Sequence, residues 1–265
     1  MKISATIITF NEEENIREAC ESLAWADEIV VVDSGSTDKT LEIAATCGAR
    51  VMSREWKGFA AQKQYAAEQS LHDWIFSLDA DERVSEELIA SIAALRKKSD
   101  NELAGGYRIA RRSYYQKRWI KGGGWYPDWQ LRLYRKSVGH WEPRLIHESV
   151  KLASGISIEK LPGDILHYSG KDAAYHHRMI GERYAPLAAQ QMLEEGRRTT
   201  PFKIATAAPS AFIGSYILKG GFRDGLAGLS IASFAAHNAF LKHLMLWEKQ
   251  KTVSSKQKAA QNSFV

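Results

Sequence analysis

Residues 73–84 read DWIFSLDADERV and pass from an apolar segment directly into three carboxylates, Asp79, Asp81 and Glu82. Adjacent carboxylates repel one another, which raises their pKa unless a cation or hydrogen-bond donors neutralise them. Asp79 and Asp81 have one residue between them, so in an extended segment they share a face and can address one ligand together. Oxygen ligands of this kind suit Mg²⁺ or Mn²⁺. Because the motif is short, a solvated turn whose acids start the next helix is the alternative.

Residues 73–79 form one of four short segments that are rich in Ile and Val and alternate with segments of helical period. The predicted strands cover residues 3–10, 28–34, 49–53 and 73–79. Asn11 is expected to cap the first helix, Ser36 or Thr37 the second, and Ser85 the helix after the fourth strand. Strands separated by helices indicate an α/β fold with a mostly parallel sheet, which binds ligands at the carboxyl ends of its strands.

Polar clusters follow three of these strands. Thr9, Asn11 and Glu12 come after the first strand, and Asp33 comes after the second, before a Gly-Ser turn that lets a ligand approach the backbone. Each cluster alone could be turn and capping chemistry. Because all three strand ends converge on one crevice, together with Asp79 they favour a site for a nucleotide diphosphate.

Length and composition describe a folded globular protein. The chain has 265 residues, 45% of them hydrophobic, and a net charge of +5, which is too mild to indicate nucleic-acid binding unless the excess is concentrated. The N-terminal stretch lacks the small-residue cleavage site of a secretory signal, which favours a cytoplasmic protein. Cys20 and Cys47 stand outside any metal-ligand spacing and are expected to be core thiols.

The pattern changes at Gly105. Strand-like segments at 105–115, 131–136 and 159–169 would complete the sheet. The segment from Arg108 to Arg144 contains ten Lys or Arg but only two acids, and eight Tyr or Trp are interleaved with them. Guanidinium groups suit phosphate and carboxylate, and aromatic rings pack on sugar faces, so a phosphorylated or acidic glycan acceptor fits this segment. A basic surface for solubility is the alternative, and nucleic acid is disfavoured because no recognisable module is present.

The chain reads as helical after Lys171. Residues 204–218 and 226–241 are uncharged runs of 15 and 16 residues, shorter than the ~20 that a spanning helix needs. Flanking Lys, Arg and Trp side chains indicate helices lying at the surface of an anionic membrane, and a core or oligomer-interface hairpin is the alternative. The expected domains are 1–170 (a nucleotide-binding half, 1–104, and an acceptor and catalytic half, 105–170), a helical region at 171–250 and a disordered tail at 251–265.

The motifs taken together resemble those of a known family. TIITFNEEENI (6–16), VVDSGSTDKT (31–40), GFAAQKQYA (58–66) and WIFSLDADE (74–82), in this order and spacing, are similar to an inverting family-2 glycosyltransferase with the GT-A fold. Further on, GWYPDWQLRLYRK (124–136), RLIHESV (144–150) and GDILHYS (163–169) resemble the bacterial branch that builds the lipopolysaccharide core, close to its β-1,4-glucosyltransferases.

This resemblance implies roles in binding a nucleotide-sugar donor. It assigns the nucleotide base to four residues, Thr9, Asn11, Glu12 and Asp33. Lys63 would lie near the ribose and phosphates, although an exposed helix Lys is equally compatible with its position. Asp79 would contact the nucleoside, and Asp81 would hold the metal that bridges the phosphates. His167 would supply a nitrogen ligand to the metal, or is simply packed at a strand end. Arg132 would reach the donor diphosphate.

The resemblance also implies the catalytic base. Transfer with inversion needs a group that deprotonates the acceptor hydroxyl opposite the leaving diphosphate. Glu148 stands at the position of the family's catalytic carboxylate, with His147 beside it where the family often has an acidic pair. Asp128 is the competing candidate, unless it only forms a turn. Glu82 is interpreted as the first acid of the following helix, and an outer ligand of the metal is the alternative.

The implied function is transfer of a hexose, glucose from UDP-glucose, onto a lipopolysaccharide-core or related glycolipid. The enzyme would be peripheral on the cytoplasmic face of the inner membrane and would use Mg²⁺ or Mn²⁺. One alternative is a sugar nucleotidyltransferase, but its usual Gly-rich, Lys-bearing N-terminal loop is missing from the sequence. The other is a non-catalytic nucleotide-sugar binding protein, which would need neither Asp81 nor Glu148.

Overall fold

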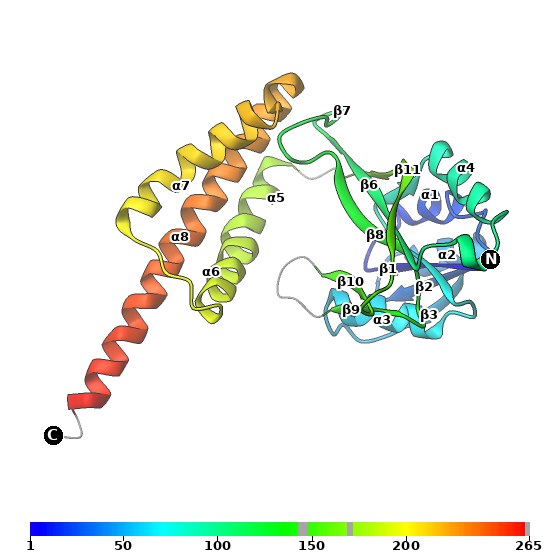
Figure 1. The fold of residues 1–265 in the computed structure, drawn as a ribbon, viewed down its shortest axis with the longest axis horizontal. Coiled ribbons are helices and arrows are strands. Elements are labelled where there is room, and N and C mark those ends of the chain that lie inside the picture. The colour runs from blue at the N-terminus through cyan, green and yellow to red at the C-terminus, as the bar shows by residue number, and fades with distance from the viewer. Residues whose placement is uncertain (143–147, 169–171, 263–265) are drawn as a thin grey trace. The chain divides into compact units, whose positions relative to one another are not determined.

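The computed structural model describes residues 1–142, 148–168 and 172–262 and divides the chain into two compact units. The sheet unit contains Met1–Tyr114 and Tyr126–Ser169, and the helical unit contains Tyr115–Trp125 and Gly170–Val265 (Figure 1). The hairpin segment 115–125, which the sequence places in the acceptor and catalytic half, therefore belongs with the C-terminal helices.

The sheet unit follows the alternating pattern expected from the sequence. Its strands are β1 (Ile3–Thr9), β2 (Glu28–Asp33), β3 (Arg50–Ser53), β4 (Trp74–Asp79), β5 (Glu82–Val84), β6 (Gly106–Tyr115), β8 (Asp128–Arg135), β9 (Gly139–Glu142), β10 (Ser149–Leu152) and β11 (Ile158–His167). Its helices are α1 (Ile16–Glu21), α2 (Thr40–Thr46), α3 (Phe59–Gln69), α4 (Glu86–Leu95) and the 3₁₀ turn η1 (Asp100–Glu102). The short strand β7 (Arg118–Trp119) lies in the segment 115–125 of the helical unit.

One large sheet runs in the order β3-β2-β1-β4-β8-β6-β11-β5, with β7 beside β6. The first four strands in this order are parallel, and β8 then joins β4 in the antiparallel sense. Beyond β4 the sheet is mixed. β8 pairs with β6 in the antiparallel sense, β6 pairs with β11 in the parallel sense, and β5, which comes from before Gly105, pairs antiparallel with β11. A separate ribbon pairs β9 with β10.

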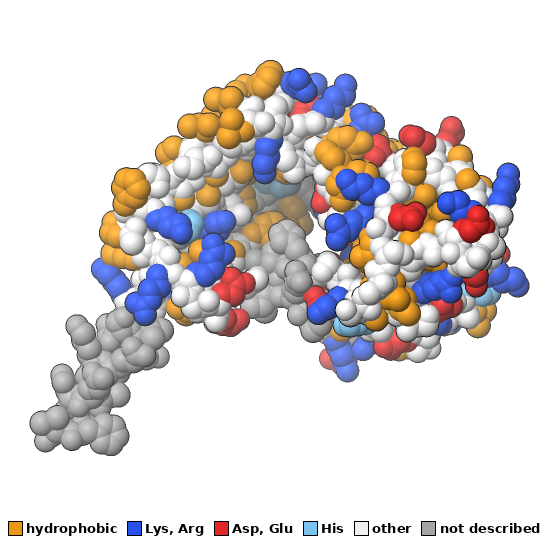
Figure 2. Space-filling model, viewed as in Figure 1, with side chains coloured by type: hydrophobic (Ala, Val, Ile, Leu, Met, Phe, Trp, Pro, Cys, Tyr) orange, Lys and Arg blue, Asp and Glu red, His pale blue; other side chains and the backbone are white. Residues whose placement is uncertain are grey.

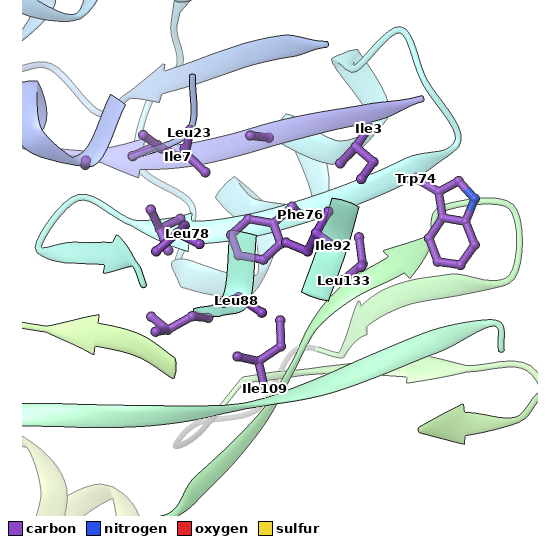
Figure 3. Packing of buried hydrophobic residues seen from close by; sticks show 14 of the residues in the cluster. Ile3, Ile7, Leu23, Trp74, Phe76, Leu78, Leu88, Ile92, Ile109 and Leu133 are labelled. Carbon is purple, nitrogen blue, oxygen red and sulfur yellow. The ribbon is translucent and has the colours of Figure 1, made fainter. Parts of the chain in front are cut away.

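Alternation along the strands separates the two faces of the sheet. Ile3 and Ile7 of β1 and Phe76 of β4 pack in one cluster with Ile16 of α1 and Leu88 of α4 (Figure 3). Successive strand side chains point to opposite faces. Ile8, which follows Ile7 in β1, accordingly packs in a different cluster with Val30, Val32 and Ala66, where α3 covers the sheet. Both faces are buried, as a parallel sheet requires.

The helix starts only partly match the sequence prediction. Ser85 caps α4 by accepting a hydrogen bond from the Leu88 N–H. The caps expected at Asn11 and at Ser36 or Thr37 are wrong, because α1 begins at Ile16 and α2 at Thr40. Those three side chains join the loops at the sheet edge instead.

A bulge in β11 depends on glycine. The register of β11 against β6 shifts between Lys160 and Asp164, and Gly163 within this shift has φ +93°. A Cβ at Gly163 would lie 2.3 Å from the Leu88 backbone nitrogen, so β11 can approach the start of α4 only with glycine there.

We therefore expect Gly163→Ala to lower the free energy of unfolding by about 3 kcal/mol or more, through a left-handed φ and a clash with backbone. Gly155→Ala is the matched control, because Gly155 has φ +82° and a Cβ added there would meet nothing within 4 Å, so strain alone should cost about 1 kcal/mol. Urea denaturation measures both changes. Equal losses in the two variants would contradict the proposed close contact.

The helical unit contains α5 (Ala173–Arg178), the π-helical η2 (Met179–Tyr184), α6 (Ala185–Glu194), α7 (Pro201–Ile213), the π-helical η3 (Gly214–Leu218), the 3₁₀ turn η4 (Gly221–Asp224) and α8 (Gly225–Asn262). Asp224 ties the segment 115–125 to these helices. Its carboxylate is fully buried and accepts hydrogen bonds from the backbone N–H groups of Lys121 and Gly122. Ile120 packs beside Ala227 and Ile231 of α8.

Two sequence expectations concern this unit. The structure continues α8 to Asn262, whereas the sequence predicts a disordered tail from residue 251; the Lys, Gln and Ala residues of the tail have good helix propensity. Among the described residues, no helix is both long and apolar enough to span a membrane.

Candidate functional site

The carboxyl ends of β1, β2 and β4 bring the predicted polar residues to one edge of the sheet. Thr9 pairs with Asp33 in the register of β1 and β2, and Ile8, the neighbour of Thr9, pairs with Asp79 across β1 and β4. This convergence follows from the parallel register alone. Three strand ends therefore present Thr9, Asp33 and Asp79 at the edge where such sheets bind ligands.

The loops after β1 and β2 are joined by hydrogen bonds. Asn11 has φ +53°, a left-handed conformation that Asn tolerates better than most residues, and its side-chain oxygen accepts from the Thr37 N–H at 2.8 Å. Asp33 is buried, and its carboxylate accepts from the N–H groups of Gly35 and Ser36. The two loops are thus preorganised as one rim of the site.

Glu12 and Thr9 on this rim differ in whether their polar groups have hydrogen-bond partners. The backbone N–H of Glu12 donates to the Thr40 hydroxyl, and its carboxylate accepts from Asn15. The Thr9 hydroxyl oxygen is buried and has no hydrogen-bond partner among the described residues. Buried polar groups normally have a partner, so a ligand or water is expected to bind Thr9.

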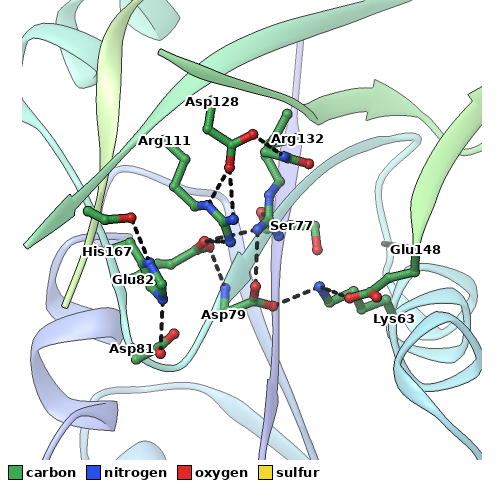
Figure 4. Close-up of polar contacts among 12 residues, drawn as sticks. Lys63, Ser77, Asp79, Asp81, Glu82, Arg111, Asp128, Arg132, Glu148 and His167 are labelled. Carbon is green, nitrogen blue, oxygen red and sulfur yellow. Dashed lines mark hydrogen bonds and ion pairs between the residues drawn. The ribbon is translucent and has the colours of Figure 1, made fainter. Parts of the chain in front are cut away.

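Lys63 connects two carboxylates that lie far apart in the sequence. Its ammonium nitrogen is 2.9 Å from Asp79 Oδ1 and 3.1 Å from Glu148 Oε1 (Figure 4). The Lys63 side chain is only 4% exposed and also lies over the Trp141 ring. It is therefore not an ordinary surface lysine, and it holds the Glu148 carboxylate at the sheet edge.

Arg132 extends this network into the interior. Its guanidinium group donates to Asp79 at 3.0 Å and to Glu82 at 2.9 Å. Glu82 is 0% exposed, lies in β5 and also accepts from the Asp79 backbone N–H. The interpretation of Glu82 as the first acid of a helix is wrong, because a short strand separates Asp81 from α4 and turns this carboxylate inward.

Arg111 and Asp128 complete the chain of alternating charges. Arg111 lies 3.5 Å from Glu82 and 2.8 Å from Asp128. Asp128 lies in β8 rather than in a turn, and it also accepts from Gln130. The sequence pattern places Arg111 only in a basic segment and not at this site. The alternation of side chains along β6 is the signal that could have indicated its direction.

The charges set the protonation states within this network. Burial alone would raise the pKa of the Asp79 carboxyl, but Lys63 and Arg132 lower it well below its usual range. Burial would lower the pKa of Arg132, but Glu82 and Asp79 raise it. Asp79 is therefore ionised and Arg132 charged at any physiological pH.

Asp81 and His167, which the family resemblance implies as metal ligands, lie next to one another beside the network. Asp81 Oδ2 is 3.3 Å from His167 Nε2, and the other ring nitrogen of His167 is 3.2 Å from the Ser113 hydroxyl. A partner on the second nitrogen fixes the imidazole, as is typical for metal-ligating histidines. Across the described ranges, no cluster of three or more Asp, Glu, His and Cys side chains forms a complete metal site. The pair fits a divalent ion that takes its other ligands from water and substrate.

One predicted residue lies outside the part of the chain that the structure describes. His147, expected beside Glu148, falls in residues 143–147. Burial, and the neighbouring Cys47 in addition, raise the pKa of the Cys20 thiol to about 12. Both cysteines are free, and they lie away from the sheet edge within the packing of α1 and α2.

The sheet order and the helices that cover it form a GT-A fold. Residues 4–161 match the family model described as "Glycosyl transferase family 2". The chain belongs to this family and is a glycosyltransferase.

Similar proteins include the lipopolysaccharide core biosynthesis glycosyltransferase LpsC of Rhizobium meliloti (strain 1021), which is 33% identical over 261 residues, 94% of this chain and 93% of that protein. An uncharacterized glycosyltransferase of Rickettsia typhi (strain ATCC VR-144 / Wilmington) is 28% identical and covers 100% of this chain and 92% of its own length. Among solved structures, residues 1–349 of S. aureus TarS align with a TM-score of 0.45 at 15% identity, over 95% of this chain and 92% of that one.

Proposed function

We propose that this glycosyltransferase moves a hexose, glucose from UDP-glucose, with inversion onto a lipopolysaccharide-core or related membrane-anchored glycan. The observation that carries the proposal is the Lys63 bridge between Asp79 and Glu148. It joins a carboxylate at the nucleotide-binding edge to a second carboxylate suited to act as a base. The similarity to LpsC, whose name refers to lipopolysaccharide core biosynthesis, supports the choice of acceptor.

The donor nucleotide would bind along the joined loops of β1 and β2. Thr9 has an unpartnered hydroxyl there, and Asn11, Glu12 and Asp33 hold the surrounding backbone in place. Asp79, ionised and at the same edge, would accept hydrogen bonds from the nucleoside. Lys63 and Arg132 would add positive charge near the phosphates, although both already bind carboxylates. The donor phosphates would therefore have to compete for Lys63 and Arg132.

Asp81 and His167 would hold the Mg²⁺ or Mn²⁺ ion. Once bound, the ion supplies charge neutralisation for the departing diphosphate. The remaining chemistry belongs to the chain. Glu148 would accept the proton of the acceptor hydroxyl as that oxygen attacks the anomeric carbon on the face opposite the leaving group. Lys63 would hold the Glu148 carboxylate at the sheet edge, where it would meet the acceptor hydroxyl.

Asp128 is a weaker candidate for the base. Its carboxylate is engaged by Arg111 at 2.8 Å and by Gln130 at 2.7 Å, so both oxygens have partners. A general base needs an oxygen within reach of the substrate proton. Among the described residues, Glu148 is contacted by Lys63 through Oε1, so its Oε2 atom can face the substrate. The phosphorylated or acidic glycan itself would be recognised by Arg and aromatic side chains of the sheet unit.

A transfer assay tests this proposal. Purified protein is mixed with UDP-glucose and lipopolysaccharide truncated in its core, and UDP release and the mass of the glycan are measured. We expect transfer with Mn²⁺ or Mg²⁺ and at least a hundredfold less after chelation or in Asp81→Asn, because the charge of the leaving diphosphate is then not neutralised. His140→Gln is the control for His167→Gln, because His140 is an exposed residue of β9. Full metal-dependent transfer by both Asp81→Asn and His167→Gln would contradict the metal assignment.

A further inference from the structure

The two units differ sharply in charge. The helical unit contains 16 Lys and Arg and 6 Asp and Glu, counted over residues 115–125 and 170–265. The rest of the chain contains 20 Lys and Arg and 25 Asp and Glu. The whole chain's mild positive charge thus conceals a strongly basic helical unit and an acidic sheet unit. A basic surface of this kind attracts anionic partners.

Acidic side chains are nearly missing from one long stretch of this unit. Between residues 196 and 247 the one acid is Asp224. Its carboxylate is 0% exposed and is occupied by the backbone N–H groups of Lys121 and Gly122. The surface formed by this stretch therefore presents positive charge with no exposed carboxylate to offset it.

The end of the unit where α7 passes into α8 carries exposed apolar side chains. We call this surface the turn patch; it consists of Ile217, Leu218, Phe222 and Leu226, flanked by Lys219 and Arg223. Their exposed fractions are 55%, 79%, 53% and 72% for the four apolar residues in that order. Figure 2 shows hydrophobic side chains next to Lys and Arg at this end of α7. Adjacent large apolar side chains at such exposure mark an interaction surface.

The backbone fixes the turn patch in place. The Ser215 hydroxyl, which is buried, donates to the Gly123 carbonyl at 2.9 Å, and Gly220 adopts φ +68° to close the turn. Gly221 is buried against the Ser215 carbonyl and leaves no room for a Cβ. The patch is therefore built into the packing of the unit and is not a frayed helix end.

We infer that the turn patch inserts into the headgroup region of an anionic lipid bilayer, with Lys219 and Arg223 binding lipid phosphates. Apolar side chains rimmed by basic ones are the signature of interfacial binding, and long basic side chains can extend past an apolar surface to reach headgroups. The Arg223 guanidinium already lies over the Phe222 ring at 6.0 Å. A second copy of this chain that meets the turn patch with its own turn patch is the poorer occupant, because two basic surfaces would repel one another. This surface extends the proposed function by naming the lipid chemistry, and it does not depend on the transfer reaction.

Vesicle flotation of the full chain tests the inference. We expect the protein to float with vesicles of phosphatidylglycerol and phosphatidylethanolamine at low salt, and to bind vesicles of phosphatidylcholine weakly. The double variant Leu218→Ser with Leu226→Ser should lower partitioning about tenfold or more, since two apolar side chains that would insert into the bilayer are lost. Lys219→Gln should lower it about fivefold on anionic vesicles only. Leu71→Ser is the matched control, because Leu71 is 76% exposed on the sheet unit.

Two further measurements separate the possible outcomes. Light scattering reports the oligomeric state, and thermal stabilisation by UDP with Mn²⁺ reports the donor site without lipid. Equal flotation of the wild type and the double variant would overturn the inference. It would also be overturned if the wild type is a dimer and the double variant a monomer, with no change in flotation. Donor stabilisation that persists in either case would leave the proposed function standing, because the two sites are tested independently.

Discussion

Glu148→Gln should abolish glycosyl transfer while leaving donor binding intact. The amide keeps the shape of the side chain but cannot take the acceptor proton, and loss of a general base costs about 10² to 10⁴-fold in turnover. Lys63 keeps its contact with Asp79 at 2.9 Å, so the nucleotide-binding edge should persist. The checks are turnover measured as UDP release in the presence of acceptor, and the shift of the melting temperature by UDP.

Two comparisons sharpen this experiment. Asp128→Asn tests the competing base, and we expect it to retain far more activity than Glu148→Gln because Arg111 already engages that carboxylate. Glu159→Gln, an exposed acid in β11, is the matched control and should be unchanged. Normal turnover by Glu148→Gln, or a loss of activity confined to Asp128→Asn, would remove Glu148 from the mechanism.

Arg132→Met should destabilise the protein by about 3–5 kcal/mol, the range for removing one partner of a buried ion pair. Glu82 is 0% exposed and would keep only Arg111 at 3.5 Å as an ion-pair partner among the described residues. Asp79 would lose one of its two cations. The free energy of unfolding, measured by urea titration, provides the test.

The control for this variant lies three residues along the same strand. Arg135 pairs with Asp100, whose side chain is 78% exposed, so Arg135→Met should cost less than about 1 kcal/mol. Similar losses in the two variants would mean that the buried network does not carry the stability assigned to it.

Acid titration adds an independent check on the same network. The folded pKa of Asp79 is lowered from 3.8, so its contribution to stability is present above the unfolded pKa and is lost as pH falls below about 4. Arg132→Met should weaken this loss, because the pKa of Asp79 would then return toward its unfolded value.

The strands and the residues at their carboxyl ends were predictable from local pattern. Runs of Ile and Val separated by helical segments indicated the sheet, and parallel register then brought Thr9, Asp33 and Asp79 to one edge. Asp81 and His167 lie 3.3 Å apart. Their role as metal ligands, which was drawn from a family resemblance, stays a prediction.

The features that local sequence pattern did not predict depend on long-range packing. Nothing near Glu82 indicates that β5 turns its side chain toward Arg111 and Arg132, which come from antiparallel strands added much later in the chain. The expected caps at Asn11 and Ser36 failed for a related reason. Each side chain can form a local cap, but here each binds the neighbouring loop, and this choice depends on two strands being adjacent.

A screen of nucleotide sugars for protection against thermal unfolding, with and without Mn²⁺, tests the central claim most directly. A ligand that binds only the native state raises stability by an amount that grows with its concentration relative to Kd, about 2.7 kcal/mol at a hundredfold excess. We predict that UDP-glucose raises the melting temperature, that Mn²⁺ increases this effect, and that Asp81→Asn removes the increase. Failure of every nucleotide sugar to stabilise the wild-type protein in the presence of Mn²⁺ would contradict the account.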